Sequence, residues 1–281
     1  MFGFVYDLGM GTLEQFVDDR LIQGRATFSR EEAEATLHLT QDALTAALVR
    51  LASRKRLASP RKGFFLILRP EDQTTSAPDP AQWIDPLMQA LQLDYRVSLL
   101  RAAAFHGASH QAAMVFQVIV PRQLRGIELG RHRVEFLYQA PASFAKANQA
   151  EALDRIKTNA GDARVAGVEL TLLDCVRYFH KAGGINTVAQ VAKDIGGKAE
   201  PRRLAKLAAT YETSCARRLG YLLERVGRVR QAKGLEPFAH KAKTFVPLDP
   251  SVKTVSNVLS TLVEKNARWK LLINEHVEVD F

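Results

Sequence analysis

Two histidines spaced four residues apart, His106 and His110, are the first residues whose types and spacing suggest chemistry. On a helix this spacing would place both imidazoles on one face, where they could bind a metal ion. Gly107 between them weakens the helix, and no glutamate follows His106 to complete the zinc-binding pattern His-Glu-x-x-His. The later histidines are scattered, and nothing groups them with cysteine or carboxylate side chains as a metal site would require. We therefore expect packed or hydrogen-bonded histidines and no bound metal or other cofactor.

Enzymatic chemistry finds little support in the remaining motifs. A metal-dependent nuclease would need clustered carboxylates with a nearby lysine, and the sequence contains no Glu-x-Lys or Asp-x-Lys. A nucleotidyltransferase would need a Gly-Ser turn followed by a strand that carries two carboxylates. Gly107-Ala108-Ser109 imitates the turn, but the strand expected at 115–120 has no acidic residue. The sequence predicts no catalytic residues, although a degenerate nucleic-acid-processing enzyme remains an alternative.

Positive charge is the dominant chemical feature, with a formal net charge of +9 over 281 residues. Residues 181–243 carry 14 basic and 5 acidic groups, which equals the whole excess. A second basic run lies at 50–62, with six basic residues and no acidic one. Two separated basic regions favour a polyanion such as double-stranded DNA as partner. A surface that is basic without a specific partner is the alternative.

Cellular location is indicated only by what the sequence lacks. No apolar run is long enough to span a bilayer, and the first residues do not resemble a signal peptide. Cys175 and Cys215 lie in apolar surroundings typical of core packing. We expect a cytoplasmic protein without a membrane partner.

A proline-rich segment divides the chain. Residues 69–81 read RPEDQTTSAPDPA, without apolar periodicity. We predict a first domain over 1–70, a linker over 71–81 and a second domain over 82–281.

The first domain has the pattern of three helices and a hairpin. Thr12, Ser29 and Thr40 are predicted helix N-caps, and Leu44, Leu48 and Leu51 form an apolar stripe on the third helix. Strands at 57–59 and 64–68 would flank a basic turn at 60–63. This order predicts a winged helix-turn-helix.

The third helix then presents a polar face to a partner. A 100° step places five residues on or beside the face opposite the stripe, where they would read bases: Gln41, Thr45, Ala46, Val49 and Arg50. Residues at the helix ends and at the wing would contact phosphates: Thr40, Arg54, Lys55, Arg56, Arg61 and Lys62. Since winged helices also bind proteins, a protein-binding module remains an alternative.

The second domain is predicted to be α+β, because its strands and helices are grouped rather than strictly alternating. We expect helices at 83–93, 95–108 and 147–159, a strand at 114–120 and a strand pair within 126–138. Helices are expected at 170–181, with Glu169 or Thr171 as N-cap, and at 187–195, 201–211 and 215–226, with a loop at 227–234 and a strand within 267–281.

Nine basic residues in this domain form what we call the C-terminal basic cluster. They could follow a phosphate backbone, dock an acidic partner or be solvated helix faces. The cluster comprises Arg202, Arg203, Lys206, Arg217, Arg218, Arg225, Arg228, Arg230 and Lys233.

Several dispersed blocks resemble the AbiEi-type antitoxins, which act as transcriptional regulators in abortive-infection systems. The blocks are SLLRAAAFHGASHQAAMVFQVIV at 98–120, GVELTLLDCVRYFHKAGGINTVAQVAKDI at 167–195, RRLGYLLERVG at 217–227 and WKLLINEHVEVD at 269–280. The resemblance implies a repressor that binds inverted repeats in its own promoter. It also implies an antitoxin that counteracts a nucleotidyltransferase-like toxin, without a stable complex. No dimerisation segment is evident, so we expect a monomer in solution or a dimer formed on DNA.

Overall fold

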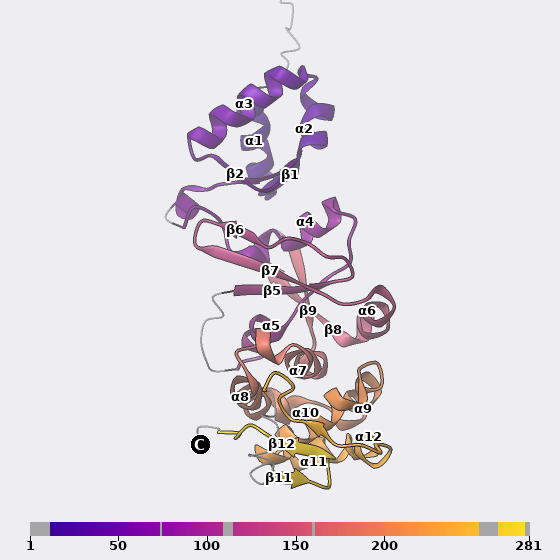
Figure 1. Ribbon diagram of the computed structural model, residues 1–281. Helices are drawn as coiled ribbons and strands as arrows, with labels where there is room; N and C mark the ends of the chain where they lie inside the picture. The colour runs from indigo at the N-terminus through magenta and orange to yellow at the C-terminus, as the bar shows by residue number, and fades with distance from the viewer. Residues whose placement is uncertain (1–11, 74, 109–114, 159–160, 253–263, 279–281) are drawn as a thin grey trace, which may run out of the picture. The chain divides into compact units, whose positions relative to one another are not determined.

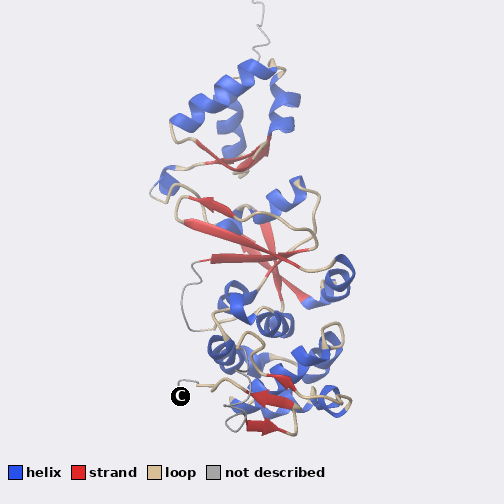
Figure 2. Ribbon diagram, viewed as in Figure 1, coloured by secondary structure: helices blue, strands red, loops and turns tan. Residues whose placement is uncertain are grey.

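A computed structural model describes residues 12–73, 75–108, 115–158, 161–252 and 264–278 (Figure 1). The chain forms two compact units. The first contains the described residues of Met1–Asp94 with Arg125–Glu135 and Ile156–Ala163, and the second contains the remainder. Helices and strands are mixed along the chain (Figure 2), as the predicted α+β class requires. No helix among the described residues is long and apolar enough to cross a membrane.

The N-terminal segment folds as three helices with three short strands. Its elements are α1 (Leu13–Ile22), β1 (Thr27–Ser29), α2 (Arg30–Leu37), α3 (Gln41–Ser53), β2 (Leu57–Arg61) and β3 (Phe64–Ile67). Thr12, Ser29 and Thr40 cap the three helices, as their sequence positions predicted. Each side chain accepts a hydrogen bond from a backbone N–H of the first turn, which has no partner within the helix.

The apolar stripe of α3 is confirmed as part of the core. Leu44, Leu48 and Leu51 are buried against α1 residues such as Val17 and against Phe28 of β1. Phe28 packs edge-on against Phe16, with the ring centroids 5.3 Å apart. The burial of these side chains removes apolar surface from water and fixes which side of α3 faces outward.

The three strands form an antiparallel sheet in the order β1-β3-β2. β1 was not predicted, because three residues are too few to show alternation. The turn predicted at 60–63 was wrong in length: β2 continues to Arg61 through an irregularity between Ala58 and Arg61, and only Lys62 and Gly63 turn. Proline has no N–H to donate, so Pro60 can lie in the irregular stretch of this strand. Gly63 has a positive φ of 80°, which the tight turn requires.

A six-stranded sheet has the order β6-β7-β5-β4-β9-β8. Its strands are β4 (Arg96–Val97), β5 (Val115–Val120), β6 (Ile127–Leu129), β7 (His132–Tyr138), β8 (Leu153–Thr158) and β9 (Gly161–Ala166). β4 pairs antiparallel with β5 and parallel with β9. The predicted strand at 115–120 and the pair broken at Gly130 are confirmed; Met114 of the first prediction lies outside the described residues.

Two helix predictions near this sheet were wrong. The helix expected at 95–108 is only α5 (Leu99–Phe105), since the residues before it form β4. The helix expected at 147–159 is replaced by the end of α6 (Pro141–Ala147), a single 3-10 turn and β8. β8 lies at the sheet edge and exposes most of its charged side chains, so no apolar alternation marked it in the sequence. The helix expected at 83–93 is confirmed in its centre as α4 (Ile84–Ala90).

The chain after β9 is mainly helical, as predicted. Its helices are α7 (Val168–Arg177), α8 (Ile185–Ile195), α9 (Pro201–Ala208), α10 (Thr213–Arg225), α11 (Val229–Lys233) and α12 (Glu236–His240). The N-cap of α7 is Gly167, not Glu169 or Thr171, because the helix begins earlier than its polar residues suggested. The loop predicted at 227–234 was also wrong, since it contains α11; its two glycines bound a short helix.

A small sheet in the order β10-β12-β11 closes the described chain. It consists of β10 (Val246–Pro247), β11 (Glu264–Asn266) and β12 (Leu271–Ile273), so the strand expected within 267–281 is much shorter than predicted. Before β12, the fully buried Trp269 packs against Gly220 of α10. A Cβ atom at Gly220 would lie 2.1 Å from the Trp269 ring, so only glycine permits this contact.

Candidate nucleic-acid interface and antitoxin domain

The face of α3 opposite its buried stripe is exposed. Gln41, Thr45, Ala46, Val49 and Arg50, which were predicted to read bases, all lie on it. Val49 leaves 63% of its surface exposed, although an isopropyl group gains free energy when it is buried. The structure therefore brings the five residues together on one accessible helix face, in the first unit of the chain (Figure 1).

Arg30 of α2 also belongs to this face, and sequence reasoning missed it. Its guanidinium donates to the Thr45 hydroxyl at 2.9 Å and to the Gln41 carbonyl at 3.2 Å. Its Nε pairs with Glu34 at 2.8 Å, and its backbone N–H donates to the carbonyl of Gly63 at 2.8 Å. Arg30 thus connects α2 to both α3 and the β2–β3 turn. The charge at the first position of α2 was the only sequence signal, and charge alone does not identify a partner in another helix.

The basic residues at the C-terminal end of α3 are less free than predicted. Arg54 forms an ion pair with Glu14 at 2.8 Å, and Arg56 forms one with Asp18. Both acidic residues belong to α1, which carries a cluster of carboxylates along its exposed side. Lys55 is exposed. Thr40 is committed to capping α3, since its hydroxyl accepts the Ala43 N–H at 3.3 Å.

The turn between β2 and β3 presents one of its two cations to solvent. Lys62 is exposed, whereas the guanidinium of Arg61 is half-buried and donates to the backbone carbonyl of Arg125. Burial, and after it the nearby charge of Arg125, lowers the pKa of Arg61. In this structure Arg61 therefore helps to hold the chain around residue 125, so Lys62 is the cation of the pair that is free to reach a partner.

The C-terminal basic cluster divides into exposed and structural members. Arg202, Arg203 and Lys206 of α9 are exposed, as are Arg225, Arg230 and Lys233. Arg203 pairs with the buried Glu169 at 3.6 Å, and Lys206 pairs with Glu151 at 3.3 Å.

Three arginines of the cluster were wrongly placed on the predicted basic surface. Arg217 is buried, and it donates to the carbonyls of Thr244 and Lys270. Arg218 is half-buried and donates to the Pro247 carbonyl at 3.0 Å. Arg228 donates to the Lys193 carbonyl. Each of the three guanidinium groups thus donates to backbone carbonyls of its own domain, which ties these side chains to the fold.

Only His106 of the histidine pair lies among the described residues. His106 is the C-cap of α5, and its Nε2 lies 2.7 Å from the Ala166 carbonyl. This is the hydrogen-bonded histidine that the sequence favoured, whereas His110 and Ser109 of the Gly-Ala-Ser turn lie outside the described residues. No group of three metal-binding side chains occurs within the described ranges.

A buried polar network occupies the centre of the second unit. Arg96 of β4 and Asp174 of α7 are both fully buried, and the guanidinium donates to the two carboxylate oxygens at 2.8 Å each. Ser98 and Tyr211 donate to the same carboxylate at 2.7 and 2.6 Å. Burial lowers the pKa of Arg96, but the charge and hydrogen bond of Asp174 together with the nearby Tyr211 and Tyr178 outweigh it, so the pKa is raised overall. Both oxygens of Asp174 therefore accept two hydrogen bonds each from these side chains, which indicates a structural role for the carboxylate.

The described elements thus define a mixed α/β protein with an exposed helix face in one unit and an ordered polar core in the other. Residues 96–225 match the family model described as the AbiEi antitoxin C-terminal domain. This part of the chain is similar to the AbiEi antitoxin C-terminal domain, as the resemblance predicted, and the match supports an antitoxin role, with a toxin as the implied partner.

One solved structure supports the fold. The crystal structure of the RV2827C protein from Mycobacterium tuberculosis matches with a TM-score of 0.63, at 16% sequence identity. The match covers 92% of this chain and 90% of that chain. At this identity the similarity concerns the fold alone. No curated protein matches the chain.

Proposed function

We propose that the N-terminal segment is a winged helix-turn-helix that binds the promoter of its own operon and represses it. The exposed outward face of α3 is the observation that carries this proposal. Val49 and Ala46 offer apolar contacts suited to thymine methyl groups, and Gln41 and Arg50 offer the donors suited to adenine and guanine. The strand order β1-β3-β2 with α3 before the hairpin agrees with this class of DNA-binding domain.

The second part of the proposal concerns the toxin. The antitoxin domain acts, on this proposal, without catalysis and without a cofactor against a nucleotidyltransferase-like toxin in the cytoplasm. The exposed members of the C-terminal basic cluster add non-specific affinity for DNA.

The domain limits of 1–70, 71–81 and 82–281 remain a prediction. So does the oligomeric state, a monomer in solution or a dimer on DNA inverted repeats.

The experiment is a gel-shift titration of the full chain on its promoter fragment and on scrambled DNA, at two salt concentrations. We expect a preference for the promoter of about 10³-fold or more, and weaker binding at higher salt. Arg50→Glu should abolish that preference, because it places a carboxylate in the groove. Arg131→Glu is the matched control, an equal charge change at another exposed residue of the same unit. Equal losses in the two variants would contradict the assignment of α3.

Direct capture of the toxin is the second candidate function, favoured by the antitoxin domain itself. Co-expression with the neighbouring gene product tests it. A complex that survives purification, together with promoter binding no tighter than to scrambled DNA, would favour the protein-binding module over the repressor.

A further inference from the structure

The first unit contains a pocket whose lining combines positive charge with apolar surface. Its volume is about 480 Å³, within the range of small-molecule sites. The wall comes from the end of α1, from β1, from Phe64 of β3 and from Pro86, Gln89 and Ala90 of α4. None of these residues belongs to the exposed face of α3, so the pocket is distinct from the proposed DNA-reading surface.

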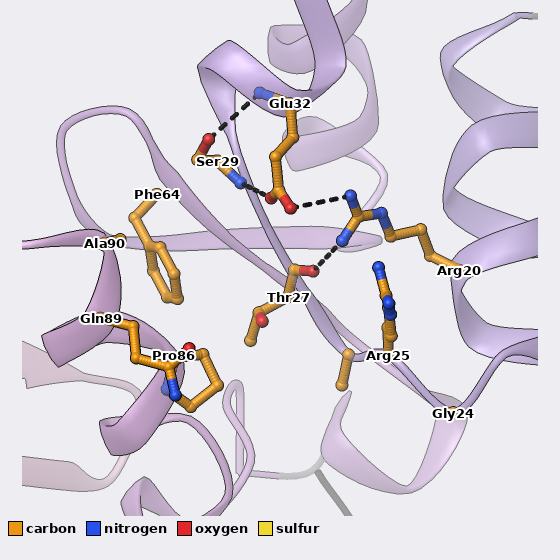
Figure 3. A pocket seen from close by; sticks show the side chains of 11 residues that line it. Arg20, Gly24, Arg25, Thr27, Ser29, Glu32, Phe64, Pro86, Gln89 and Ala90 are labelled. Atoms are coloured by element: carbon orange, nitrogen blue, oxygen red, sulfur yellow. Dashed lines mark hydrogen bonds and ion pairs between the residues drawn. The ribbon is translucent and has the colours of Figure 1, made fainter. Parts of the chain in front are cut away.

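Two arginines make one side of the pocket positive. Arg20 is held in place, since it donates to the Thr27 carbonyl at 3.1 Å and pairs with Glu32 at 3.1 Å, with its side chain only 12% exposed. Arg25 is exposed, and within the described part of the chain its guanidinium has no hydrogen-bond or ion-pair partner. In Figure 3 the guanidinium of Arg20 points toward Thr27 and Glu32, and the Arg25 side chain lies on the same side of the pocket. Like charges on one side of a pocket are stabilised when an anion binds beside them.

Glu32 is the only carboxylate in the lining, and it is already neutralised. One oxygen pairs with Arg20, and the other accepts the Ser29 N–H at 2.7 Å in the capping box of α2. Ser29 and Glu32 thus pair with each other's backbone N–H groups, and the N–H of Arg30 donates to the Gly63 carbonyl. The uncompensated positive charge is that of Arg25, so the pocket favours an anionic group at this residue.

The opposite side of the pocket is mostly apolar, with Gln89 as its polar residue. In Figure 3 the Phe64 ring and Pro86 lie across Thr27 from the two arginines. Ala90 lies on the same side as Phe64. A ligand that contacts both sides needs a charged end and a hydrocarbon body. Inorganic phosphate would use only the first side, and a neutral hydrocarbon only the second.

We propose that this pocket binds a small organic anion, with its carboxylate or phosphate at Arg25 beside Arg20 and its hydrocarbon body against Phe64 and Pro86. A ligand at Arg20 would compete with the Arg20–Glu32 ion pair, and Glu32 belongs to the capping box of α2. The ligand would thus act on the helix that carries Arg30. Ligand binding in this pocket does not itself require DNA.

Calorimetric titration of the full chain with phenyl phosphate and with phenylacetate tests the proposal. Inorganic phosphate and benzyl alcohol serve as probes of the charge alone and of the apolar wall alone. We expect at least one of the two organic anions to bind on the order of tenfold tighter than either control, and Arg25→Ala to remove this gain. Arg25 is exposed, so the variant is expected to fold, and Arg131→Ala, which removes an exposed charge elsewhere in the unit, should leave binding unchanged.

Three outcomes would overturn the proposal. Neither organic anion binds more tightly than inorganic phosphate, or benzyl alcohol binds as tightly as the anions, or Arg25→Ala binds them as the wild-type chain does. If Arg25→Ala weakens binding to duplex DNA alone, the two arginines form part of a nucleic-acid surface and not of a small-molecule site. Failure of the promoter gel shift would leave the first three outcomes readable, because the titration uses no DNA.

Discussion

The guanidinium of Arg30 donates a hydrogen bond of 2.9 Å to the hydroxyl of Thr45, from one helix to the exposed face of the next. The same guanidinium reaches the carbonyl of Gln41 at 3.2 Å. Thr45 in turn donates to that carbonyl at 2.7 Å, so its hydroxyl is oriented before any partner arrives. Such ordering reduces the entropy lost when a surface binds a ligand.

Arg30→Lys is therefore expected to lower specific affinity for the promoter, by about fivefold to tenfold, since a lysine cannot make the forked contacts. Affinity for scrambled DNA should change by less than about twofold, because the variant keeps the charge. The two affinities are measured by gel shift at one salt concentration. An equal loss on both DNAs would contradict a role of Arg30 in ordering the exposed face of α3 for specific binding.

Removing the acidic partners of Arg54 and Arg56 should strengthen non-specific DNA binding. Glu14→Gln with Asp18→Asn frees both guanidinium groups for phosphates, and the salt dependence of binding should steepen by about one counterion for each. The free energy of unfolding should fall by less than about 1 kcal/mol, because these pairs are exposed. Asp19→Asn, a neighbouring charge change without a side-chain ion pair among the described residues, is the control. If all variants share one salt dependence, the two arginines do not contact DNA.

Loss of the carboxylate at Asp174 should be costly to the antitoxin domain. Asp174→Asn leaves the buried charge of Arg96 without its counter-charge, and breaking a buried pair in this way costs about 3–5 kcal/mol. Urea unfolding measures the change in free energy. Glu212→Gln, which breaks the more exposed pair with Arg177, should cost less than about 1 kcal/mol. Equal losses of unfolding free energy in the two variants would contradict the prediction, because they would show that the charge of Arg96 is still compensated in Asp174→Asn.

Stability should decrease as the pH rises into the alkaline range. Burial raises the pKa of Tyr211 and of the thiols of Cys175 and Cys215 above their ordinary values. Above about pH 8.5 the unfolded chain loses the thiol protons while the folded chain retains them, so the free energy of unfolding falls with pH. Each thiol contributes a slope of up to about 1.4 kcal/mol per pH unit.

Urea unfolding at pH 7.5 and pH 9.5 checks this expectation. In a Cys175→Ala, Cys215→Ala variant the difference between the two pH values should shrink, even if both stabilities are lower. An unchanged difference would assign the alkaline loss to other groups.

The N-terminal helices could be predicted because their signals are local. Thr12, Ser29 and Thr40 cap helices within three residues of themselves, and Leu44, Leu48 and Leu51 mark a buried face by spacing alone. The exposed face of α3 follows from the same spacing. These parts of the candidate site needed no knowledge of distant residues.

Features that depend on distant partners could not be predicted. β8 is a strand because a neighbouring strand offers backbone partners, while its own side chains are mostly exposed. Arg217 became part of the predicted basic surface, yet it donates to carbonyls at Thr244 and Lys270, far away in the sequence. In the same way, Arg61 meets Arg125 across 64 positions of sequence. The sequence shows which residues are cationic. It does not show whether each cation contacts solvent, a backbone carbonyl or DNA.

The contact between Gly220 and Trp269 matters for how this chain is made. During synthesis the ribosome completes α10 long before it adds residue 269. Until then the surface of α10 at Gly220, against which the Trp269 ring packs, stays uncovered. A protein fragment that ends at residue 225, where the family match ends, would lack Trp269 and leave this surface of α10 uncovered. Expression of the antitoxin domain alone should therefore extend past Trp269, since a shorter fragment would show this apolar surface to chaperones and proteases.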